Sequence, residues 1–265
     1  MKLLPFVFTY YSDFVLAALI CLVAGLRWIV VPTDRKRTEC LLVVAMLAQP
    51  AVVLSKEIAN ALSHLRPLKY DLYLYRIDAI FGEPSFRIGQ IVLPHHWLVI
   101  VMQVSYSFLS IAMLGTFAVY LWLKPAAETF KVGRIFALNL FLAPVFYLLI
   151  PVCGPEFAFP QFPQLPPLHL VPHMVAIAAA PNGIPSVHTS TALLVLWFLR
   201  PWPWGRRLGR IFLALTVLST LGGGQHYFFD LLCAVPYAAG IVWLDNRYAA
   251  RSAAQLSAAS YASAD

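Results

Sequence analysis

The amino-acid sequence predicts an all-α fold, a polytopic bundle of transmembrane helices. Of its 265 residues, 60% are hydrophobic and only 12% are charged, and the mean hydropathy is +0.74. A soluble domain has about 45–50% apolar and about 25% charged residues, so this composition excludes a water-soluble globule, a disordered chain and a small disulfide-linked secreted module. The apolar runs are also long and continuous, whereas an outer-membrane barrel alternates apolar and polar residues in stretches of about ten.

Segments of the length that a spanning helix needs, about 20 residues, follow one another along the chain. The predicted spans lie near residues 6–31, 39–62, 97–123, 132–151, 186–200, 208–223 and 226–244. The fifth and sixth are short and begin in polar or Gly-rich sequence, so we expect neighbouring helices to bury them in part. We predict one integral-membrane domain over residues 1–250, followed by a flexible tail over 251–265.

The basic residues predict the orientation of these spans. They follow the first, third, fifth and seventh spans, at residues 35–37, 124–134, 200–210 and 247–251. Cytoplasmic loops carry an excess of Lys and Arg, so these groups are expected in the cytoplasm. The loop over 152–185, which has neither residue, is expected outside. The net charge of +7 is then largely a topology signal, and we expect no nucleic-acid partner.

One outside segment, residues 63–96, does carry charges. In it Asp71, Arg76 and Asp78 alternate with apolar and aromatic side chains at roughly helical spacing. This pattern is typical of an amphipathic helix that lies among lipid headgroups. We expect its charges to face water, although some of its cations could attract phosphate.

Two short stretches place ionisable residues where spans begin, and such residues at membrane depth mark functional sites. Pro185 and Ser186 predict a helix start, with His188 in the first turn. The free backbone N–H groups and the positive dipole end at such a start bind phosphate. Ser186 is therefore a candidate phosphate-binding position, next to an imidazole.

The second stretch opens the last span with His226 and Asp230, four residues apart. On a helix such residues share one face and can meet. A carboxylate that binds one imidazole nitrogen leaves the other free to act as a nucleophile or base. Because the spans alternate in direction, His188 and His226 are both expected at the outer face of the membrane.

Together these stretches carry a family resemblance. Pro185-Ser186-x-His188 and His226-x-x-x-Asp230 resemble the second and third signature motifs of the type 2 phosphatidic acid phosphatase superfamily. Within it the chain is more similar to the inositol phosphorylceramide synthase branch. That closer resemblance lies in Tyr227, in Asp71, Asp78, Phe81-Gly82 and Pro84, and in Gly154-Pro155, Phe157 and Phe159.

The chain also departs from the phosphatase motifs. Where the phosphatases carry Ser-Arg ahead of the nucleophilic His, this chain has Ser219-Thr220. The first motif has only a stretched counterpart, Lys56 followed after nine residues by Arg66-Pro67. Both departures count against an ordinary lipid phosphatase.

The resemblance implies a six-helix core with one extra N-terminal span, and a phosphohistidine mechanism. In it His226, oriented by Asp230, attacks the phosphoryl group, while His188 protonates the leaving alkoxide and then activates the acceptor. Ser186, Lys56 and Arg66 are the phosphate-binding candidates. Neither a metal nor a cofactor is implied.

The expected function is that of a membrane-embedded lipid phosphotransferase or phosphatase, which transfers phosphoinositol or a similar headgroup to a lipid alcohol. One alternative is a lipid or isoprenoid-diphosphate phosphatase that uses water as the acceptor. A second is a proton-coupled transporter. The expected partners are a phospholipid or lipid-phosphate substrate and the bilayer, with the site on the extracytoplasmic side, in a bacterial inner membrane by preference.

Overall fold

The computed structural model describes residues 18, 21–22, 25–26, 28–30, 35–167 and 170–262. The first predicted span, 6–31, therefore falls mostly outside the described residues. Its described residues are helical.

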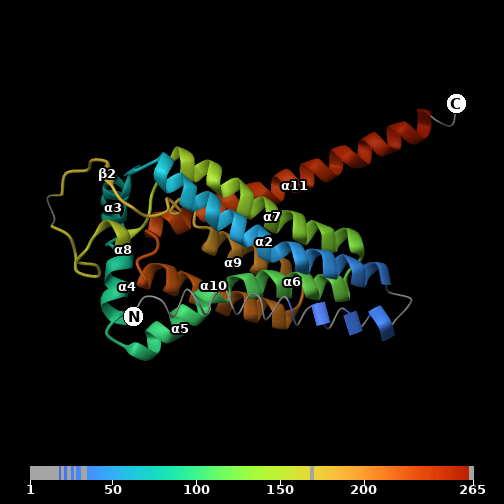
Figure 1. Cartoon of the computed structure of the whole chain (residues 1–265), viewed down its shortest axis with the longest axis horizontal. Coiled ribbons are helices and arrows are strands. Elements are labelled where there is room, and N and C mark those ends of the chain that lie inside the picture. The colour runs from blue at the N-terminus through green and yellow to red at the C-terminus, as the bar shows by residue number, and fades with distance from the viewer. Residues whose placement is uncertain are drawn as a thin grey trace.

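Long helices make up most of the molecule (Figure 1). They are α2 (Arg35–Leu65), α5 (His96–Ser107), α6 (Leu109–Leu123), α7 (Ala126–Leu149), α9 (Val187–Leu199), α10 (Pro203–Gly222) and α11 (Phe228–Ala262). The shorter elements are α3 (Asp71–Ile80), α4 (Pro84–Val92), α8 (Pro155–Ala158), β1 (Leu68–Lys69) and β2 (Val175–Ala176). The predicted helical fold is confirmed, and one antiparallel pair of two-residue strands is added to it.

Two of the described helices are long and apolar enough to cross a bilayer by themselves, over Ala127–Leu149 in α7 and Phe228–Arg251 in α11. Helices α5 and α6 are apolar enough together, but they bend by 47° at Phe108, as a broken span or a re-entrant loop would. Helix α9 is apolar but shorter. The structure thus supports an integral-membrane bundle, and the count of six spans plus one stays a prediction.

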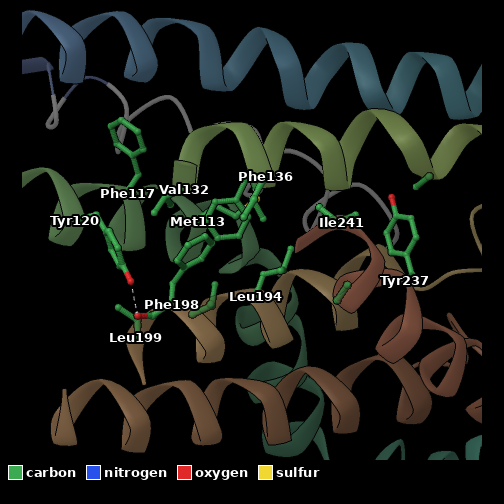
Figure 2. Packing of buried hydrophobic residues seen from close by; sticks show 14 of the residues in the cluster. Met113, Phe117, Tyr120, Val132, Phe136, Leu194, Phe198, Leu199, Tyr237 and Ile241 are labelled. Carbon is green, nitrogen blue, oxygen red and sulfur yellow. Dashed lines mark hydrogen bonds between the residues drawn. The ribbon is translucent and has the colours of Figure 1, made fainter. Parts of the chain in front are cut away.

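Helix α9 lies at the centre of the bundle because it is apolar on every side. It packs against α6, α7, α10 and α11, and a helix that is hydrophobic all round is buried. Figure 2 shows Phe198 reaching toward Phe136 of α7, where the two ring centroids are 5.8 Å apart. The Tyr120 hydroxyl of α6 donates a 2.9 Å hydrogen bond to the Phe198 carbonyl. In lipid, such close packing and interhelical hydrogen bonds hold helices together, so α9 has a fixed position.

At one end of the bundle, α3, α4 and α8 cover the helix ends (Figure 1). A second apolar cluster holds them there, with Tyr75, Phe86 and Phe159 in mutual ring contact. The expectation that the charges of this segment face water is wrong for Asp71 and Asp78, which are fully buried. The carboxylates turn inward because backbone N–H groups bind them there: those at 153–154 before α8 bind Asp71, and those of the first turn of α11 bind Asp78. Arg76 is exposed, as expected.

Candidate functional site

The start of α9 carries the first candidate histidine. Ser186 is the N-cap residue, and its Oγ accepts a 3.3 Å hydrogen bond from the backbone N–H of Thr189. The helix start predicted at Pro185-Ser186 is therefore confirmed. His188 lies in the first turn of α9 and is half-buried.

His226 lies in the loop before α11, and not on the helix as the sequence suggested. Helix α11 begins at Phe228. The Asp230 carboxylate reaches back from the first turn and accepts a 2.9 Å hydrogen bond from the N–H of Tyr227. The reason is that the first N–H groups of a helix have no partner within it and need an external acceptor. Asp230 is thus a cap as well as a neighbour of His226.

The side chains of Asp230 and His226 nevertheless lie next to each other. The distance from His226 Nδ1 to Asp230 Oδ2 is 3.4 Å, which is long for an N–H···O hydrogen bond. Nδ1 has no closer acceptor, and the other Asp230 oxygen, Oδ1, is buried without a hydrogen bond. Both side chains are almost completely buried.

The two histidines lie side by side although 37 residues of chain separate them. Their ring centroids are 6.0 Å apart, with an angle of 59° between the ring planes. The backbone N–H of Ser186 contributes to this approach with a 3.4 Å hydrogen bond to the carbonyl of Asp230, which joins the starts of α9 and α11. At this spacing, both rings can reach the oxygens of one phosphoryl group.

Several side chains that lie around the histidines belong to neither of the sequence motifs named above. The Tyr106 ring of α5 stacks on the His188 ring, with centroids 4.0 Å apart. Behind α9, the buried Asn139 side chain accepts a hydrogen bond from Ser190 and donates one to Thr191. Because these contacts join helices far apart in the sequence, no local pattern could have revealed them.

Of the cations proposed for phosphate, Lys56 is near the histidines. It is half-buried on α2, and its charge acts on the His188 imidazole. Arg66 lies beyond the end of α2, where its carbonyl accepts a hydrogen bond from the Lys69 ammonium. In the described part of the chain, the Arg66 guanidinium makes no contact with either imidazole. The structure thus places Lys56 where its charge reaches His188, and both Lys56 and Arg66 stay predictions as phosphate ligands.

Lys69 is a third charged residue of the 63–96 segment for which the expectation of exposure to water is wrong. It is fully buried, and burial lowers the pKa of its ammonium, which the nearby Cys153 and Asp71 oppose. Among the described residues, no three His, Cys, Asp or Glu side chains are grouped as metal ligands.

The sequence comparisons give one match. The family model described as the PAP2 superfamily matches residues 73–244, well over half of the chain and the part that contains both histidines and Asp230. Neither the curated proteins nor the solved structures give a match.

Proposed function

The chain belongs to the PAP2 superfamily, whose members act on lipid phosphates in membranes, and from this we propose that it forms a phosphohistidine intermediate. It acts on a phospholipid-type phosphoester as a membrane-embedded phosphotransferase or phosphatase. The observation that carries the proposal is the 6.0 Å separation of the His188 and His226 rings. Paired imidazoles suit a displacement at phosphorus in two steps, because one can attack while the other transfers protons.

In the first step, Nε2 of His226 attacks phosphorus, and a P–N bond forms as the bond from phosphorus to the leaving oxygen breaks. Asp230, next to Nδ1, stabilises the positive charge that develops on the ring. His188 gives its proton to the leaving oxygen. A bound phosphate favours the protonated form of His188, since opposite charges stabilise one another.

In the second step, His188 removes a proton from the acceptor hydroxyl. The acceptor oxygen attacks phosphorus, the P–N bond breaks, and His226 returns to its neutral form. With a lipid alcohol as acceptor, the product is a new phosphodiester; with water, it is a free phosphate or phosphoinositol. The covalent intermediate is common to both reactions.

The phosphoryl oxygens are best placed at the start of α9. The dipole end of that helix is positive, and Lys56 adds a full charge near His188. The start of α11 is a poorer site, because Asp230 and Asp78 already bind its N–H groups. Ser186 and Lys56 are therefore the first phosphate ligands to test, followed by Arg66.

We place the site on the extracytoplasmic side of a bacterial inner membrane. Helix α9 (Val187–Leu199) has His188 in its first turn and is followed directly by Arg200, one of the basic residues of 124–134 and 200–210. Those residues lie at the opposite end of the bundle from the histidines, and cytoplasmic ends are rich in Lys and Arg.

The test is a product analysis in lipid nanodiscs. The wild type and His226→Ala receive ³²P-labelled phosphatidic acid in one reaction, and labelled phosphatidylinositol with ceramide in the other. Free phosphate from the first identifies a phosphatase, and inositol phosphorylceramide from the second identifies a transferase. Product formation by His226→Ala at the wild-type rate would contradict the mechanism, as would the absence of product from the wild type in both reactions.

A further inference from the structure

We propose that Asp78 of α3 is a positioning residue for His226, an inference that rests on the nucleophilic role given to His226 above. Asp78 does not touch the reacting atoms. It holds the start of α11, and with it the loop that carries the nucleophile. Ser85, on α4, holds the same loop from its other side.

Asp78 binds two consecutive N–H groups at the first turn of α11. Its Oδ2 accepts a 3.0 Å hydrogen bond from Phe228, 150 residues away in the chain, and its Oδ1 accepts a 3.0 Å hydrogen bond from Phe229. The carboxylate is fully buried. A capping acceptor normally comes from the residues just before a helix, but here the sequence before α11 is His226-Tyr227, which has no short polar side chain to supply one.

The neighbouring contacts show that the whole loop is held from α3 and α4. The Ser85 hydroxyl donates a 2.8 Å hydrogen bond to the backbone carbonyl of His226 itself. The Tyr227 hydroxyl donates a 3.2 Å hydrogen bond to Asp71, and the rings of Phe81 and Phe228 lie 5.4 Å apart. Contacts with the α3–α4 segment therefore fall on residues 226, 227, 228 and 229 in turn.

This arrangement matters for catalysis because Asp230 alone does not fix His226. The contact between His226 Nδ1 and Asp230 is long, at 3.4 Å. The direction of the attacking Nε2 therefore depends on the backbone on either side of the ring. Misplacement of a reacting group by about 1 Å can lower a rate about 100-fold.

The charge of Asp78 supports the same role. Burial raises the pKa of Asp78 to about 6, with smaller contributions from Asp230 of α11 and from Glu83, while the N–H groups of Phe228 and Phe229 lower it. At pH 7 the group is ionised and accepts both hydrogen bonds. When it is protonated, one of its oxygens becomes a donor and no longer suits an N–H partner.

The pH dependence of activity and that of fold stability distinguish a positioning role of Asp78 from a purely structural one. A raised carboxyl pKa stabilises the fold most below about 3.8 and loses that contribution as the pH rises through about 6. Protonation of Asp78 between pH 7 and pH 5 therefore weakens its hydrogen bonds to the start of α11 without lowering the stability of the fold. A merely structural residue would lower activity and stability together.

The experiment compares the wild type, Asp78→Asn and Ser85→Ala in nanodiscs, on whichever donor the wild type uses, phosphatidic acid or phosphatidylinositol. The control Glu128→Gln removes an exposed acid at the other end of the bundle. We expect Asp78→Asn to lower kcat by about 10- to 100-fold at pH 7, with KM within about twofold of the wild-type value. Its kcat should also fall less between pH 7 and pH 5 than that of the wild type, because the amide already resembles the protonated acid.

Ser85→Ala keeps the carboxylate and should lower kcat several-fold, which tests the proposal even if Asp78→Asn does not fold. The inference is overturned if both variants keep wild-type kcat and pH dependence, or if their activity falls only in proportion to the folded fraction. In either case a wild type that still forms product leaves the proposed function standing. A wild type that forms no product removes the proposed function and this inference together.

Discussion

Replacing Gly154 by alanine tests how tightly the outer loop holds the nucleophile loop. Gly154 has φ +119° and ψ 162°, a conformation that is essentially restricted to glycine. A Cβ there would lie 2.7 Å from the carbonyl carbon of Gln225, and closer still to its oxygen, whereas ordinary contacts begin near 3.4 Å. Gln225 directly precedes His226, so the two loops must separate by about 0.7 Å or more to admit the methyl group.

The size of the effect follows from that displacement. A shift approaching 1 Å at the nucleophile lowers kcat by about 10- to 100-fold, and the backbone strain lowers the free energy of unfolding by about 1–3 kcal/mol. The assay measures lipid turnover and thermal unfolding of Gly154→Ala in nanodiscs. Gly240→Ala is the matched control, since nothing lies within 4 Å of a Cβ at that position in α11. If Gly154→Ala equals this control in kcat and stability, the reasoning from loop contact is refuted.

Three further outcomes are expected. His188→Ala should retain slow turnover, lower by about 10²–10⁴-fold, and should still form the covalent intermediate, whereas His226→Ala should form none in rapid-quench experiments. Lys56→Gln should raise KM for the lipid phosphate about tenfold, because a hydrogen bond to a charged group contributes about 1.5 kcal/mol, and Lys56→Arg should restore most of the affinity in the same assay. Burial raises the pKa of Asp71 to about 6, so its contribution to stability is fully present below about 3.8 and lost as the pH rises through 6. Thermal unfolding of Asp71→Asn should accordingly depend less on pH between 5 and 7 than that of the wild type, and equal slopes would contradict the assignment.

The parts of the fold that local sequence determines could be predicted. Pro185-Ser186 is a strong start signal, and α9 does begin directly after it with His188 in its first turn. The alternation of spans placed His188 and His226 at one face, and the rings lie 6.0 Å apart. The first prediction depends on helix capping, which involves only a few neighbouring residues. The second depends on the direction of whole spans, which their order in the chain determines.

The remaining features depend on contacts between distant segments. Charges in an amphipathic stretch normally face water, yet Asp71 and Asp78 are buried because the loop at residue 153 and the first turn of α11 supply N–H partners. The spacing of His226 and Asp230 suggested one helical face, but the helix begins at Phe228 and Asp230 caps it. The stacking of Tyr106 on His188 likewise depends on how α5 packs.

The most direct test of the mechanism is to identify the residue that carries the phosphoryl group. The wild type in nanodiscs is mixed with ³²P-labelled phosphatidic acid or phosphatidylinositol and stopped in alkali, which preserves a P–N bond, and the labelled peptide is then sequenced by mass spectrometry. The account predicts acid-labile label on His226, lost in His226→Ala and longer-lived in His188→Ala. Turnover without label, or label on any other residue, would contradict it.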